Sequence, residues 1–208
     1  MGGTRDFTHP RGVTSAQVSK GMGMTHYEIP RPIDGDVVEL ILDDHRLFEA
    51  LLRDLRDATA DRETARETLS NVLIAHGEAE EEKVYTQLKS KKAITAHEAE
   101  HGEEEHAEGN EALLALLECK GTDTQKFDDA VEELAKALNH HIGEEEQTIL
   151  NPAREDVSEQ VRLDLGAAWA ARRNELLDEG AGSITNVRKI VARAHKEGLL
   201  PADEEEDE

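Results

Sequence analysis

Apolar side chains recur every three or four residues along four consecutive stretches of the chain. The stretches cover about residues 36 to 58, 61 to 89, 95 to 119 and 123 to 152. Because residues three and four apart share one face of a helix, this spacing predicts four amphipathic helices. The alternating pattern that is typical of β-strands does not compete with it. We therefore expect an all-α protein built as an antiparallel, up-down four-helix bundle.

Polar caps and helix-breaking residues indicate where these helices begin and end. Thr95 and Glu98 have the spacing of a capping box at the start of the third helix. Thr122 and Asp123 are candidate N-caps of the fourth. Pro152 is expected to end that helix, because proline has no amide hydrogen to donate.

The segments on either side of the bundle differ from it. Residues 1–35 are rich in glycine and proline, which predicts a flexible N-terminal tail. After the bundle of residues 36–152, helical spacing returns in residues 153–200, where Ser158 can cap a fifth helix. This segment is expected to be a C-terminal helical extension. Residues 201–208 are mostly acidic and predict a disordered tail.

Charge excludes several classes of partner. The chain has 47 acidic and 24 basic residues, a net charge of -23, and should repel both nucleic acid and anionic membrane surfaces. No apolar stretch approaches the roughly 20 residues that span a bilayer, and the N-terminus lacks the apolar segment of a secretory signal. The single cysteine, Cys119, cannot form an intrachain disulfide. These features favour a cytoplasmic protein.

Each of the four predicted helices has one histidine on its apolar face. They are His45, His76, His106 and His141. Counted from the expected helix ends at about 1.5 Å per residue, the four lie at similar heights in an antiparallel bundle. The imidazoles are therefore expected to converge inside it.

Two of these histidines are followed four residues later by a glutamate, His76 by Glu80 and His141 by Glu145. Residues at this spacing project from one helix face. A single such pair in so acidic a chain is more often a solvated surface pair. Two pairs on apolar faces, each matched by a lone histidine at the same height, indicate a metal centre. Imidazole and carboxylate ligands suit iron, manganese or zinc, and two shared carboxylates imply two metal ions.

Four segments of the chain resemble the hemerythrin-like, HHE cation-binding family over about residues 36–152. They are DVVELILDDHRLFEALLRDL, IAHGEAEEEKVYTQL, EEEHAEGNEALLALL and NHHIGEEEQTILNPA. The resemblance implies a bundle enclosing a non-haem di-iron centre that meets dioxygen, peroxide or nitric oxide. The implied ligands are His45, His76, Glu80, His106, His141 and Glu145. Both glutamates would bridge the two iron ions, and manganese or zinc are the weaker alternatives.

One position departs from the oxygen-carrying members of that family. They have a further histidine one turn before the third-helix ligand, where this chain has Gly102. Either one metal ion would have fewer ligands, or Glu49 or a water would fill the place. A position of Glu49 behind the ligands or along a channel is an equal alternative. Asn110 is a candidate hydrogen-bond partner behind the ligands. His101 is expected at the surface. It would become an additional ligand only if the start of its helix were distorted. Tyr85 is expected to be a packing residue at the end of the bundle.

Three functions follow as hypotheses. The first is a di-iron protein that reacts with dioxygen-derived molecules, with catalase-like consumption of peroxide or a role in iron handling and oxidative stress. The alternative is reversible binding or sensing of dioxygen or nitric oxide, signalled to a protein partner through residues 153–200. The third is a structural bundle without metal, which metal analysis distinguishes from the other two.

Overall fold

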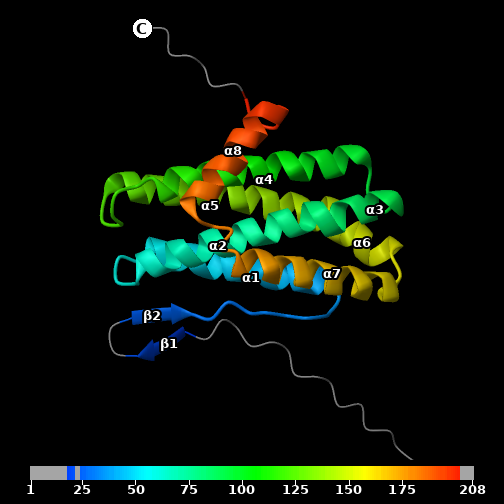
Figure 1. The fold of residues 1–208 in the computed structure, drawn as a ribbon, viewed down its shortest axis with the longest axis horizontal. Coiled ribbons are helices and arrows are strands. Elements are labelled where there is room, and N and C mark those ends of the chain that lie inside the picture. Colours follow the sequence, from blue (N-terminus) through cyan, green and yellow to red (C-terminus); the bar gives the residue numbers. More distant parts are fainter. Residues whose placement is uncertain (1–17, 22–23, 202–208) are drawn as a thin grey trace, which may run out of the picture.

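The computed structural model describes residues 18–21 and 24–201. Four long helices form an antiparallel bundle, shown in Figure 1: α1 (Val37–Arg56), α2 (Arg62–Glu80), α4 (Ala96–Leu117) and α5 (Gln125–Glu145). α1 packs against α2, α2 against α4, α4 against α5, and α5 against α1. The all-α bundle expected from the apolar spacing is confirmed.

Side-chain caps fix the starts of these helices. Asp36 accepts a hydrogen bond from the amide of Val38 before α1. Thr95 and Glu98 form the predicted capping box of α4. The cap of α5 is Thr124, one residue beyond the candidates chosen from the sequence. Each cap satisfies an amide that has no partner within its helix.

Helices α2 and α5 each continue through one π-helical turn. The turns are η1 (Glu81–Tyr85) and η2 (Glu146–Leu150), which lead into α3 (Thr86–Ser90) and α6 (Asn151–Asp156). A π-helical turn is wider than an α-helical turn, because its hydrogen bonds join residues five apart. Glu80 and Tyr85, five residues apart across η1, are therefore both buried on the inner side of the bundle.

Pro152 does not end the fourth helix, contrary to the prediction. It lies directly after the π-helical turn η2, at the second residue of α6. The chain stays helical up to Asp156.

Two further helices cover the bundle from outside, α7 (Glu159–Asp178) and α8 (Ile184–Glu197). α7 packs along α1 and α2, and α8 packs on α4 (Figure 1). Trp169 and Arg173 of α7 are fully buried. A Cβ on Gly166 would lie 2.0 Å from the carbonyl oxygen of Gly35, so only glycine allows α7 this approach. The C-terminal extension is thus packed into the core.

The second half of the predicted N-terminal tail is also packed on the bundle. Strands β1 (Val18–Gly21) and β2 (Met24–Tyr27) pair as an antiparallel hairpin. The Tyr27 hydroxyl then donates a hydrogen bond to Asp54 Oδ2 at 2.7 Å, and Arg173 Nη1 donates to the carbonyl oxygen of Pro30 at 2.9 Å. The tail interpretation is therefore wrong for this segment. Glycine and proline content indicated flexibility, but it could not show which side chains bind the segment's carbonyl groups.

Residues 1–17, 22–23 and 202–208 lie outside the described part of the chain, and the flexible and acidic tails remain predictions there. Among the residues that are described, no helix is both long enough and apolar enough to cross a membrane.

Candidate metal centre

Four buried imidazoles meet in the middle of the bundle, one from each long helix. They are His45 of α1, His76 of α2, His106 of α4 and His141 of α5. The ring centroids of His45 and His76 are 5.3 Å apart, and those of His106 and His141 are 4.6 Å apart. The helix spacing alone thus places the four rings at one level, as the sequence led us to expect.

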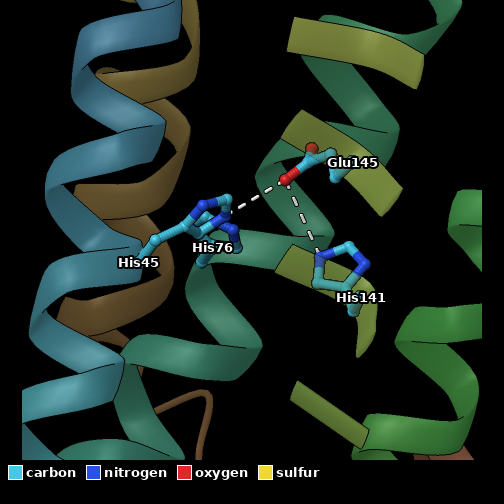
Figure 2. Close-up of side chains that lie close together, drawn as sticks. All are labelled: His45, His76, His141 and Glu145. Carbon is cyan, nitrogen blue, oxygen red and sulfur yellow. Dashed lines mark ion pairs between the residues drawn. The ribbon is translucent and has the colours of Figure 1, made fainter. Parts of the chain in front are cut away.

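Two buried carboxylates lie between these rings. Glu80 Oε1 is 3.1 Å from His76 Nε2, and Glu80 Oε2 is 3.3 Å from His106 Nε2. Glu145 Oε2 is 3.1 Å from His45 Nε2 and 3.8 Å from His141 Nε2 (Figure 2). Each carboxylate therefore lies between histidines of two different helices.

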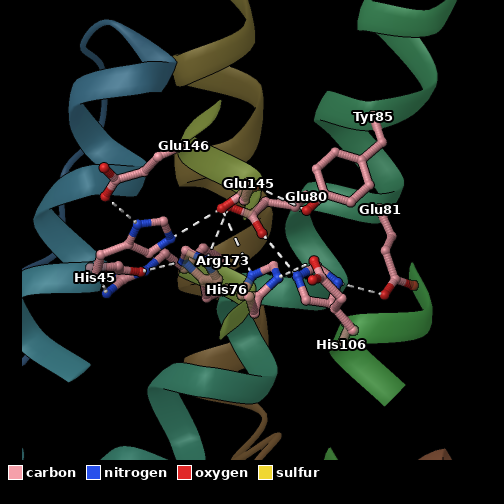
Figure 3. A network of polar contacts seen from close by, with 12 residues as sticks. His45, His76, Glu80, Glu81, Tyr85, His106, Glu145, Glu146 and Arg173 are labelled. Carbon is pink, nitrogen blue, oxygen red and sulfur yellow. Dashed lines mark hydrogen bonds and ion pairs between the residues drawn. The ribbon is translucent and has the colours of Figure 1, made fainter. Parts of the chain in front are cut away.

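A second carboxylate faces the other nitrogen, Nδ1, of every one of these histidines. The pairs are Asp44 with His76 at 3.2 Å, Glu81 with His106 at 2.9 Å, Glu105 with His141 at 3.3 Å, and Glu146 with His45 at 3.5 Å. At His76, His106 and His141 the carboxylate is hydrogen-bonded to Nδ1 and holds the proton there, which leaves the lone pair on Nε2. The Nε2 atoms of His45, His76 and His106 thus face the two central glutamates (Figure 3).

The atoms that face the centre are buried and have no hydrogen-bond partner. They are Nε2 of His45, His76, His106 and His141, both carboxylate oxygens of Glu80, and Oε2 of Glu145. Leaving buried polar atoms unsatisfied costs about 1–3 kcal/mol each, and a cation would satisfy several at once. Two overlapping groups of residues are close enough to hold a metal ion, because their ligand atoms, one from each residue, all lie within 4.8 Å of one another. The first group is His45, His76, His141 and Glu145, and the second is Glu80, His106 and His141. The residues therefore fit metal binding.

Comparison with known families agrees with this geometry. The family model described as Hemerythrin HHE cation binding domain matches residues 36–152. The chain belongs to the hemerythrin HHE cation-binding family. No curated protein and no solved structure matches it. The buried histidine and glutamate cluster and the family together make this a metal-binding, hemerythrin-like protein.

Arg173 connects the hemerythrin-like bundle to a helix outside the family match. Its Nε and Nη2 donate hydrogen bonds to the two oxygens of Asp44 at 2.6 and 2.7 Å. Burial alone would raise the pKa of Asp44, but the charge of Arg173 and the hydrogen bond from His76 lower it below its ordinary value. Asp44 is therefore ionised behind His76. Trp169 of the same helix packs edge-on against the His76 ring, with centroids 5.8 Å apart.

Tyr85 lies in the centre, and the expectation that it packs at the bundle end is wrong. Its hydroxyl donates a hydrogen bond to Glu145 Oε1 at 2.9 Å, and its ring stacks on His106 with centroids 5.7 Å apart. Burial, together with the negative charge of Glu145, raises the pKa of Tyr85 well above its usual value, so the hydroxyl keeps its proton. The phenol occupies the space that we expected Glu49 or a water to fill beside Gly102.

The three other candidates lie away from the central atoms. Glu49 is exposed, because the neighbouring Phe48 takes the inward face of α1 and packs its ring 4.9 Å from that of His76. Asn110 is half-buried and lines a cavity of about 20 Å³ next to His106 and His141. His101 does not join the centre. Its side chain is 43% exposed, with Nε2 3.6 Å from Glu105 Oε1.

Without a metal ion, protons would neutralise the centre. Burial opposes a charge on His76, but Glu80 and Asp44 outweigh it and raise its pKa to about 9. The pKa of His106 is also raised well above its ordinary value, against the effect of burial, by Glu80 and Glu81. The pKa of His141 is lowered instead, because burial dominates there and His106 adds repulsion. In the metal-free protein, the positive charge that balances the buried carboxylates thus comes from protonated His76 and His106.

Proposed function

We propose that this chain is a non-haem di-iron protein. The proposed ligands are His45, His76, Glu80, His106, His141 and Glu145. The observation that carries the proposal is the set of buried Nε2 and carboxylate oxygen atoms that face one another without hydrogen bonds. Glu80 and Glu145 each lie between histidines of two helices, which supports the proposal that both would be shared between two ions. Manganese and zinc accept similar donors, but a mixed imidazole and carboxylate set with open positions is typical of non-haem iron.

The proposed reaction is the consumption of hydrogen peroxide, in which two molecules give one dioxygen and two waters. Bound iron would supply electron transfer and an open coordination position. The protein would supply a proton donor, the Tyr85 hydroxyl, which donates a hydrogen bond to Glu145 beside the centre. It also shields the centre from solvent, because all six proposed ligands are buried and Phe48 and Trp169 pack against the His76 ring. A protonated donor in a dry site suits a reaction that moves protons between two oxygen species.

Peroxide consumption by the iron-loaded protein tests this proposal. His106→Ala removes one ligand and should lower the rate by about a hundredfold or more. His195→Ala, on α8 and paired with Glu111 at the surface, should leave it unchanged. Equal rates in wild type and His106→Ala would contradict the proposal.

A second candidate function is reversible binding or sensing of dioxygen or nitric oxide. The observation that favours it is the series of contacts from His76 through Asp44 to Arg173, which reaches from the centre into α7. A change at His76 would be felt in the C-terminal extension, which could then contact a protein partner. After anaerobic reduction and exposure to oxygen, a spectrum that reverses on degassing supports this function, and irreversible oxidation contradicts it.

We also propose a cytoplasmic location. Cys119 is a free, buried thiol, which fits a reducing compartment. Cell fractionation that recovers the protein with the membranes would contradict this location.

A further inference from the structure

A surface recess of about 250 Å³ lies where α8 packs on α4 (Figure 1). Residues of α2, η1, α4 and α8 form its walls. The cavity of about 20 Å³ beside His106 and His141 adjoins this recess, because Glu78, Glu81 and Asn110 line both spaces. The recess therefore leads from the surface toward two of the proposed ligands, whose buried Nε2 atoms have no hydrogen-bond partner.

Five carboxylates and one guanidinium group line the described part of the recess. They are Glu78, Glu81, Glu82, Glu103 and Glu197, with Arg193. Glu82 is paired with Arg172 of α7, and Glu78 is paired with Arg193 of α8. The other three carboxylates have no lysine or arginine partner among the residues that the structure describes. The recess thus has an excess of negative charge, which attracts cations.

Glu81 connects the recess to the centre. Its Oε1 lies 2.9 Å from His106 Nδ1, and its side chain is 30% exposed (Figure 3). A cavity of about 20 Å³ has room for roughly one water-sized particle, so a hydrated ion has to give up most of its water before it reaches His106. Carboxylate oxygens are ligands that divalent cations accept in exchange for water. Glu78 and Glu81, which line both spaces, can supply them.

Arg193 opposes the entry of a cation. Its Nη2 lies 2.6 Å from Glu78 Oε1. Burial would lower the pKa of Arg193, but the negative charges of Glu78, Glu81 and Glu197 raise it above its usual value. The side chains of Arg193 and Glu78 are 50% and 21% exposed, and such a pair is worth only about 0–1 kcal/mol. The pair can therefore open easily.

We propose that this recess is the route by which a divalent cation, Fe²⁺ in the proposed function, enters the centre, and that Arg193 restricts it. The inference rests on the proposed function, because it needs a centre that binds metal. A neutral molecule such as peroxide gains little from the charges, so they favour a cation as the entering species. Arg193 and Glu197 belong to α8, outside residues 36–152 that match the family model, so the C-terminal extension completes this entrance.

The rate at which metal-free, full-length protein takes up Fe²⁺ tests the proposal. The two are mixed without oxygen, and the ferrous ion still free is trapped with a coloured chelator after set times. Glu103→Gln with Glu197→Gln should slow uptake by about threefold or more at low salt. Arg193→Gln should speed it by about twofold or more. Both differences should shrink as salt screens the charges. The final iron content should not change, because none of these residues is a proposed ligand.

Glu133→Gln with Glu155→Gln is the matched control for charge. Both residues are exposed, on α5 and α6, and this double variant changes the net charge by the same amount. Its uptake rate should equal that of wild type. Equal slowing in the two double variants, or no acceleration in Arg193→Gln, would overturn the proposal.

Gly109→Ala tests the inner cavity, which Gly109 lines. The added Cβ would lie 3.7 Å from Leu138 Cδ2, so it narrows the cavity without a clash and should slow uptake. Gly143→Ala, where nothing lies within 4 Å of the added Cβ, should not. The final iron content separates this inference from the proposed function. A wild type that fills completely, with the same uptake rate in every variant, overturns the entrance alone, whereas a wild type that never fills overturns the metal centre and its entrance together.

Discussion

Gly102 lies directly against Tyr85, so that a Cβ at position 102 would be 2.9 Å from Cε2 of the tyrosine ring. The ring has little freedom to move away, because its hydroxyl is bound to Glu145 and its face is stacked on His106. Any side chain at position 102 therefore competes with the tyrosine for the same space. Because residue 102 is glycine, the Tyr85 ring has room to place its hydroxyl beside Glu145.

Gly102→Ala should lower the free energy of unfolding by about 1–3 kcal/mol, because the added methyl overpacks a buried site. The control is Gly143→Ala in α5, where nothing lies within 4 Å of the added Cβ. That change should be neutral or stabilise by about 0.5–1 kcal/mol, since alanine favours the helix. Urea unfolding measures both, and equal effects would show that Tyr85 does not need the space.

Tyr85→Phe should slow peroxide consumption by the iron-loaded protein, because it removes the hydroxyl at Glu145. Loss of a hydrogen bond to a charged group should also cost about 1.5–3 kcal/mol of stability. Tyr27→Phe removes the comparable bond to Asp54 far from the centre, and should affect stability alone. A Tyr85→Phe protein with wild-type turnover would exclude the phenol as a proton donor.

Arg173→Ala should destabilise the fold by about 3–5 kcal/mol, because it leaves the buried charge of Asp44 without its partner. Metal affinity should fall about 10–100-fold, since Asp44 orients His76. The neighbouring Arg172 pairs with Glu82 at the surface, and Arg172→Ala should cost about 0–1 kcal/mol. Thermal unfolding and metal titration measure both variants. Similar losses in the two would mean that the contact with Asp44 has no special role.

Stability of the protein without metal should fall as the pH rises from about 6.5 to about 9. The pKa of His76 is raised from 6.5 to about 9 in the fold, so its protonated form is favoured there. That contribution is fully present below pH 6.5 and is lost as the pH passes through about 9. His106 acts in the same direction. Urea unfolding across this range checks the trend, and constant or rising stability would contradict it.

Metal affinity should change in the opposite direction over the same range. A metal ion must displace the proton from His76, so binding becomes easier as the proton leaves. Competition titrations with a chelator of known pH dependence would measure this. An affinity that falls between pH 6.5 and 9 would place the metal somewhere other than at His76.

The bundle and its converging histidines could be predicted from the sequence because both depend on helical spacing. One apolar face per helix fixes the packing, and a histidine on that face has to point inward. The same logic failed for Glu49, since Phe48 takes the inward face beside it. The predicted position of Tyr85 was wrong for another reason. In a regular α-helix Tyr85 would point away from the centre, but a π-helical turn follows Glu80 and turns Tyr85 inward.

The carboxylates behind the histidines were missed, although a signal was present. Asp44, Glu81, Glu105 and Glu146 are each adjacent in sequence to one of the six proposed ligands. In a chain with 47 acidic residues, such neighbours do not stand out. Arg173 could not be found from the sequence, because its contact with Asp44 depends on how α7 packs against the bundle.

The iron content of the protein, measured together with its optical spectrum, tests the central claim most directly. Protein purified without chelator should contain about two iron ions per chain, with a spectrum typical of a bridged ferric pair after oxidation. The double variant Glu80→Ala with Glu145→Ala, which removes both carboxylates between the histidines, should lose that iron. Well under one iron per chain in the wild type, after iron has been offered, would contradict the account.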